Sequence, residues 1–179
     1  VMEVESYREL DDGGIGQRTG MMDGSGSTSW MYDPRGRLRW EGKTITGSGT
    51  FITEWNYNSA DLVDWMKYPG GNGVQGEQVN FTYVPQMLVK TAIGSTTYVK
   101  NATYDAAGRS DILNLGLNPN TSNAYMYLDY NYYAWDAQGG RLQWLQAVQT
   151  GSLALLQKLE YAYDAAGNVD WIKDYLAGI

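Results

Sequence analysis

A short phrase that repeats along the chain constrains the fold more than any other feature. It places an aromatic residue at the end of an extended run, then an Asp, then a turn that contains Gly. The clean copies are Tyr32-Asp33-Pro34-Arg35-Gly36, Tyr104-Asp105-Ala106-Ala107-Gly108 and Tyr163-Asp164-Ala165-Ala166-Gly167. Trp135-Asp136-Ala137-Gln138-Gly139-Gly140 is interpreted as a copy with one inserted residue, and the phrases that begin at Tyr57 and Tyr83 as degenerate copies. Six copies at intervals of roughly 20 to 30 residues indicate a repetitive architecture.

Each phrase has the composition of a tight hairpin turn. An Asp side chain accepts hydrogen bonds from backbone N–H groups inside such a turn, and Gly adopts a positive φ without steric cost. We therefore expect positive φ at Gly108 and Gly167, and hydrogen bonds from turn amides to Asp105 and Asp164. Structural, turn-forming roles are assigned to Tyr32, Asp33, Gly36, Tyr104, Asp105, Gly108, Trp135, Asp136, Gly139, Tyr163, Asp164 and Gly167.

The segments beside the turns alternate as strands do. Phe51, Thr53 and Trp55 share one face before the turn at Tyr57, and the intervening residues share the other. A second, looser turn such as Gly47-Ser48-Gly49 lies between successive phrases. Each period is thus one β-hairpin, and residues 1–179 are interpreted as a single array of about six and a half repeats, or about thirteen strands. The predicted fold is all-β: a long antiparallel sheet that curls as a fragment of a shell or spiral.

The phrase Tyr161-Ala162-Tyr163-Asp164-Ala165-Ala166-Gly167-Asn168-Val169 resembles the Tyr-Asp (YD) repeat of the Rhs, or rearrangement hot spot, family. The copies at Tyr32, Tyr104 and Trp135 fit the same pattern, and the likeness runs from about residue 10 to about residue 174. The family includes bacterial polymorphic toxins, the cocoon-forming subunits of insecticidal toxin complexes, and animal teneurins. The resemblance implies a β-sheet that spirals into a hollow shell, often around a toxin segment of the same polypeptide.

Composition excludes several classes of function. The chain has a net charge of −7 and no Lys/Arg-rich run, which argues against binding to nucleic-acid phosphates. Its longest purely aliphatic run, Leu153-Ala154-Leu155-Leu156, is too short for a spanning helix, so no membrane insertion is expected. The sequence holds neither His nor Cys, which removes Ser-His-Asp triads, thiol nucleophiles and ordinary zinc sites. We expect no catalytic residues, no metal site, no cofactor and no enzymatic activity.

The aromatic residues leave two interpretations open. The chain has 15 Tyr and 7 Trp but only 2 Phe. Tyr and Trp combine an apolar ring with a polar tip, which suits cross-strand ladders on a partly wet sheet and also suits a platform for a ligand. The densest run, residues 125–135, is the candidate platform, and strand alternation would place on one face the candidate glycan-stacking residues Tyr125, Tyr127, Tyr133 and Trp135.

The function expected from the sequence is structural. The chain is interpreted as part of a larger protein, in which an Rhs-type shell, wall or fibre encloses or displays other segments. The expected partners are neighbouring repeats of the parent chain, or identical copies that add at an edge strand or head to tail. An encapsulated toxin segment and glycans are further candidate partners, and a bacterial secreted or cell-surface location is expected. The alternative is a carbohydrate-binding module that uses exposed Tyr and Trp faces.

Overall fold

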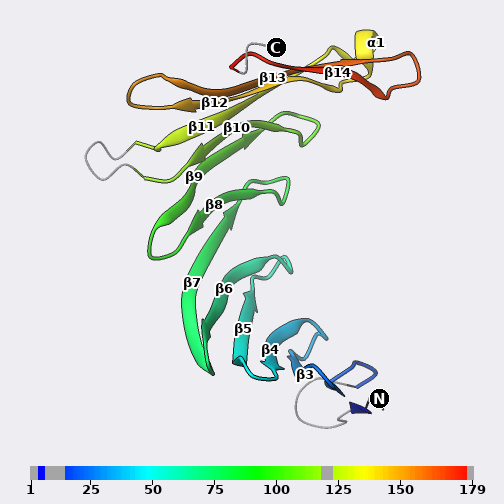
Figure 1. Cartoon of the computed structure of the whole chain (residues 1–179), viewed down its shortest axis with the longest axis vertical. Helices are drawn as coiled ribbons and strands as arrows, with labels where there is room; N and C mark the ends of the chain where they lie inside the picture. Colours follow the sequence, from blue (N-terminus) through cyan, green and yellow to red (C-terminus); the bar gives the residue numbers. More distant parts are fainter. Residues whose placement is uncertain (1–3, 7–14, 118–122, 177–179) are drawn as a thin grey trace. The chain divides into compact units, whose positions relative to one another are not determined.

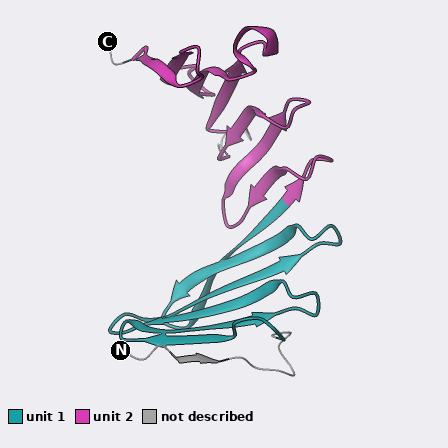
Figure 2. Ribbon diagram, turned by 90° about the vertical axis from the view of Figure 1, so that its right-hand side faces the viewer, with its two compact units in different colours: residues 1–81 teal, residues 82–179 magenta. Residues whose placement is uncertain are grey.

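The fold is all-β, as the sequence predicts. The computed structural model describes residues 4–6, 15–117 and 123–176 (Figure 1). Within these ranges it contains fourteen strands and one four-residue helix. The chain divides into two compact units, residues 1–81 and 82–179 (Figure 2), which are described separately below. The interpretation of the whole chain as one repeat array stays a prediction.

Unit 1 is a sheet in which consecutive strands pair antiparallel. The strands drawn in teal lie side by side in one layer in Figure 2. The strands of unit 1 are β1 (Val4–Ser6), β2 (Gly20–Asp23), β3 (Gly26–Tyr32), β4 (Leu38–Ile45), β5 (Gly49–Tyr57), β6 (Val63–Gly71) and β7 (Val74–Tyr83), whose residues 82–83 belong to unit 2.

Unit 2 repeats this arrangement with seven further strands, again paired antiparallel in chain order. They are β8 (Val89–Ile93), β9 (Thr97–Tyr104), β10 (Ser110–Leu115), β11 (Met126–Tyr132), β12 (Leu142–Gln149), β13 (Leu155–Tyr163) and β14 (Val169–Asp174). The one-turn helix α1 (Trp135–Gln138) lies between β11 and β12. Helical structure in the described ranges is confined to these four residues, so no helix there could span a bilayer.

Burial is limited in both units. Among the described residues no large side chain is fully buried, and the apolar residues that are buried are small: Val79, Ala92, Ala102, Ala124, Ala147 and Val148. Most aromatic rings are half-buried, as expected where a side chain packs against its neighbours on one sheet and no second layer covers it. Cross-strand packing, rather than a closed core, therefore carries the apolar stabilisation of each unit.

The prediction for the turn at Trp135 is wrong in its register. Trp135 does not end a strand: β11 ends at Tyr132, and Trp135 and Asp136 begin α1. The four-residue helical turn ends at Gly139, which has a left-handed φ of 62°. The hairpin then closes through the Tyr133 amide, which donates to the Arg141 carbonyl at 2.9 Å. The inserted residues form a helical turn. Tyr132, and not Trp135 as the sequence pattern predicts, is the aromatic residue that ends the strand.

Candidate functional site

Five turns share one backbone geometry at the same end of their hairpins. In each, the residue after the strand-ending Tyr donates its N–H to the carbonyl four residues later, at 2.8–3.0 Å. The donor and acceptor pairs are Asp33 and Arg37, Asn58 and Leu62, Val84 and Leu88, Asp105 and Arg109, and Asp164 and Asn168. The degenerate copies at Tyr57 and Tyr83 thus keep the register of the clean ones.

The residue before the end of each turn has a positive φ. The angles are 77° at Gly36, 78° at Gly108 and 90° at Gly167, which agrees with the expected turn. The two degenerate copies hold the same conformation without Gly, with φ of 63° at both Asp61 and Met87. A left-handed conformation costs a residue with a Cβ about 1–2 kcal/mol, so these two turns are intrinsically less favourable.

The turn carboxylates are occupied by hydrogen bonds from their own turns. Asp105 Oδ1 accepts from the amides of Ala107 and Arg109, both at 2.9 Å, and its Oδ2 accepts from Arg109 Nε at 2.6 Å. These bonds, first the Arg109 amide and then its guanidinium, lower the pKa of Asp105 against the opposing effect of desolvation. The pKa of Asp164 is also lowered, by the side-chain amide of Asn168 and then by its backbone N–H. Such carboxylates act as fixed acceptors in the turns.

Five of the strand-ending Tyr residues link their hairpin to the one before it, a role that was not expected from the sequence. Tyr57 OH donates to the Leu38 carbonyl at 2.7 Å, and Tyr104 OH to that of Val89 at 2.6 Å. The same contact joins Tyr132 to Ser110, Tyr163 to Leu142 and Tyr32 to Arg18. Apart from Arg18, each acceptor is the first residue of the preceding hairpin's return strand. The sequence carried one signal of this role: it has Tyr at these positions, where Phe would fill the same space without a hydroxyl.

Arginine side chains add a second connection between neighbouring turns. Arg37 stacks over the Tyr57 ring at 4.5 Å, and Arg109 over the Tyr132 ring at 4.2 Å. Arg37 also pairs with Asp61 of the next turn, while Arg109 Nη1 donates to the Gly140 carbonyl at 2.6 Å. Each of these arginines bonds its own Asp as well, Asp33 or Asp105. A turn is therefore joined to the next hairpin through a chain of Asp, Arg and Tyr.

The four candidate glycan-stacking residues do not form one exposed face. Tyr125 is 52% exposed, whereas Tyr127 is half-buried in β11 opposite Val148. Tyr133 and Trp135 lie beyond the end of β11, so strand alternation does not extend to them. The Tyr133 ring meets the Tyr163 ring edge-on at 6.3 Å, and its hydroxyl donates to the Tyr161 carbonyl at 3.0 Å.

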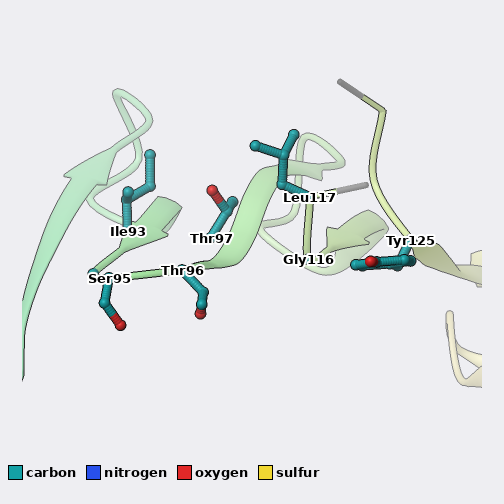
Figure 3. Close-up of a pocket in the computed structure, with 8 residues that line it drawn as sticks. Ile93, Ser95, Thr96, Thr97, Gly116, Leu117 and Tyr125 are labelled. Carbon is teal, nitrogen blue, oxygen red and sulfur yellow. The ribbon is translucent and has the colours of Figure 1, made fainter. Parts of the chain in front are cut away.

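Trp135 is the most exposed of the four, at 65%, with Arg109 4.9 Å from its ring centroid. Tyr125 borders an open hollow of about 650 Å³ whose wall includes Ser95, Thr96 and Leu117 (Figure 3). The side chains of Ser95 and Thr96 point to the opposite side from that of Leu117 in this view. The Tyr125 ring lies against Gly116, where a Cβ would come within 3.0 Å of the ring. In the described part of the chain, no group of three Asp or Glu side chains is placed to hold a metal ion.

Comparison with known proteins shows the fold. No family model and no curated protein matches the sequence. The chain is similar in structure to the crystal structure of TcdB2-TccC3, with a TM-score of 0.76 and 16% identity over 97% of this chain. It is equally similar to a mutant Tc holotoxin pore of Photorhabdus luminescens (TM-score 0.76) and to TcdB2-TccC3-TEV (0.75), both at 16% identity over 97% of this chain. The chain spans 9% of the length of each of these three structures.

Proposed function

We propose that this chain is a structural segment of an Rhs-type shell or extracellular wall that encloses or displays other parts of a larger bacterial protein. The observation that carries the proposal is the set of Tyr hydroxyl bonds between successive hairpins. These bonds hold the hairpins that they join at a fixed register and do not depend on a closed core. A sheet built in this way can be extended by adding hairpins and exposes two broad surfaces.

Three further observations support a scaffold. The similar solved structures belong to Tc toxin assemblies, and the sequence resembles the YD repeat. The turn carboxylates, which are the acid–base groups that the repeat supplies, are bonded within their turns. The proposal therefore includes no enzymatic activity, and it places the protein outside the cell or on its surface.

Protease protection in the parent polypeptide tests this function. We expect segments that follow or precede the repeats to resist proteolysis when the array is intact. Replacing Tyr57, Tyr104 and Tyr163 together with Phe removes three links between hairpins and should expose those segments. Tyr125→Phe, at an exposed ring, is the matched control and should leave the protection unchanged. Equal digestion of the other segments with and without the intact array would contradict an enclosing role.

A carbohydrate-binding surface is the second candidate function, and the exposure of Tyr125 and Trp135 favours it. An exposed aromatic face can stack on a sugar ring, since it offers apolar area beside polar groups. A glycan array should then show binding that Tyr125→Ala or Trp135→Ala reduces. Tyr133→Phe, which removes a hydroxyl already bonded to the Tyr161 carbonyl, should not affect it. Absence of binding across the array would reject this alternative.

A further inference from the structure

The strand β14 carries apolar side chains that its own unit leaves exposed. Val169 is 51% exposed, Trp171 45% and Ile172 56%. Along one edge β14 pairs with β13, where Trp171 lies opposite Ala162 and Ile172 opposite Tyr161. A strand edge with exposed apolar side chains is a surface to which another strand can add.

A nearly identical strand in unit 1 shows what covers such an edge. The sequence Val169-Asp170-Trp171-Ile172-Lys173 differs from Val63-Asp64-Trp65-Met66-Lys67 of β6 at one position. The apolar residues of β6 are half-buried, because β7 pairs with its outer edge. Asn80 lies opposite Trp65, Val79 opposite Met66, and Gln78 opposite Lys67.

The same pairing recurs wherever a hairpin adds to a strand that has a Trp at this position. Glu54 lies opposite Trp40, three residues before Tyr57, and Glu160 lies opposite Trp144, three residues before Tyr163. In both cases the Tyr hydroxyl then reaches the first residue of the preceding return strand, Leu38 or Leu142. In β14 the corresponding first residue is Val169.

We propose that the outer edge of β14 is a docking edge for a further hairpin of the same repeat. The first strand of that hairpin runs antiparallel to β14. It places a β-branched or aliphatic residue opposite Ile172 and Asn or Glu opposite Trp171. A Tyr three residues later donates its hydroxyl to the Val169 carbonyl. The inference rests on the proposed scaffold function, which supplies such hairpins, and specifies the residues that the next one must carry.

A graft tests the proposal within one polypeptide. Residues 174–179 are replaced by a second copy of residues 68–93, which contain the end of β6 together with β7 and β8. Backbone amide exchange in residues 170–173 should slow by at least about tenfold, because these amides become part of an interior strand. Acrylamide quenching of Trp171 fluorescence should fall in a background where the other exposed tryptophan, Trp135, is replaced by Phe. The matched control carries Val79→Asp in the grafted copy and should lose both effects.

A peptide with the sequence of residues 74–83 provides the same test in trans on the unmodified chain. Saturable slowing of β14 exchange by this peptide, but not by its Val79→Asp version, is the expected result. Unchanged β14 exchange in both the graft and the peptide experiment would overturn the proposal. In the unmodified chain, exchange of the β14 amides that becomes slower as the protein concentration rises would also overturn the proposal. That result would assign the edge to a second copy. These readouts concern β14 alone, so they can fail while the enclosing role tested by protease protection holds.

Discussion

Two hairpins, one in each unit, have return strands of almost the same sequence in different surroundings. The hairpin of β5 and β6 has Glu54, Tyr57 and the sequence Val-Asp-Trp-Met-Lys at residues 63–67. The hairpin of β13 and β14 has Glu160, Tyr163 and Val-Asp-Trp-Ile-Lys at residues 169–173. β6 has a paired strand on both sides, whereas β14 is the last described strand of its unit. Differences in burial between residues 63–67 and 169–173 therefore come mainly from the neighbouring strands and not from the sequences of these two segments.

The turns of the two hairpins differ in sequence but close with the same backbone hydrogen bond. One turn uses Asn58 and Asp61 where the other uses Asp164 and Gly167. Both close with the same backbone hydrogen bond, and Asn58 Oδ1 accepts from two turn amides as Asp carboxylates do elsewhere. The side chains of the turn can therefore change as long as a positive φ precedes its last residue. The turn from Val84 to Leu88 closes with the same backbone bond although Val84 has no side-chain acceptor.

The shared Glu and Lys find different partners in the two hairpins. In unit 1, Lys67 lies 3.4 Å from Glu54, which also accepts from Gln75 of β7 at 2.6 Å. In unit 2, Glu160 accepts from the hydroxyl of Tyr175, whose pKa this contact raises, and Lys173 lies 4.4 Å from the same ring. Tyr175 follows β14 directly, and its N–H donates to the Lys158 carbonyl of β13 at 3.0 Å, so it lies on the β13 side of β14.

The largest expected effect concerns the paired tryptophans. Trp65→Ala should reduce the free energy of unfolding of its unit by about 2–4 kcal/mol, because the ring is half-buried among three strands. Trp171→Ala should cost less than about 1 kcal/mol, since its ring is nearly half exposed on an edge strand. Amide exchange in each hairpin is the appropriate measurement, because long repeat arrays need not unfold in one step. Equal costs would show that β14 is covered in solution.

The next largest effect compares the two positive-φ positions. Gly167→Val should destabilise the β13–β14 turn by at least about 1–2 kcal/mol, because φ is 90° and a Cβ would meet the Arg141 guanidinium. Asp61→Gly relieves the same strain but removes ion pairs with Arg35 and Arg37, so the net change should stay within about 0.5 kcal/mol. Amide exchange in each hairpin, compared between each variant and the unmodified chain, checks both values. A Gly167→Val chain as stable as the parent would exclude a steric requirement for Gly in this turn.

The hairpin architecture could be predicted from the sequence because its determinants are local. Alternation beside a Tyr-Asp-x-x-Gly phrase specifies two strands and their turn within about 15 residues. The same reasoning fails at residues 132–142, where four inserted residues form α1. Tyr132, Tyr133 and Trp135 all had a suitable side chain for the strand end, and the later Asp136 favoured the wrong one. Trp144 pointed to Tyr132 as the residue that ends the strand. It lies opposite the residue before Tyr132, as Trp40 lies opposite the residue before Tyr32.

The contacts between hairpins could not be derived in the same way. Each Tyr hydroxyl bonds a carbonyl 14 to 22 residues earlier, and the identity of the acceptor side chain is irrelevant to the bond. No pattern of side chains marks that acceptor. The exposure of Tyr125 and the partial burial of Tyr133 likewise depend on which strands and loops lie beside them, which alternation along one strand does not specify.

Removing the hydroxyls should affect the two hairpins equally. Tyr57→Phe and Tyr163→Phe each delete one hydrogen bond to a backbone carbonyl and leave the ring in place, so each should cost about 1 kcal/mol. The loss should appear as faster exchange of the amides near Leu38 or Leu142. Tyr125→Phe is the control, with no change expected. A large cost in one hairpin only would indicate that the two links are not equivalent, despite their matching geometry.

The smallest expected effect separates the two turns by pH. The folded-state pKa of Asp164 lies below its ordinary value, because Asn168 donates to the carboxylate through its side-chain amide and then its backbone N–H. The resulting stabilisation is complete above the unfolded pKa of about 4 and is lost as the pH falls through the lower folded value. Asn58 makes the corresponding bonds to the amides of Ala60 and Leu62 without titrating. On acidification from pH 5 to pH 2.5, amide exchange at Asn168, corrected for its intrinsic rate, should therefore accelerate more than exchange at Leu62. Asp164→Asn should remove this difference while keeping the turn, and the same acceleration in the Asn variant would assign the acid sensitivity to another group.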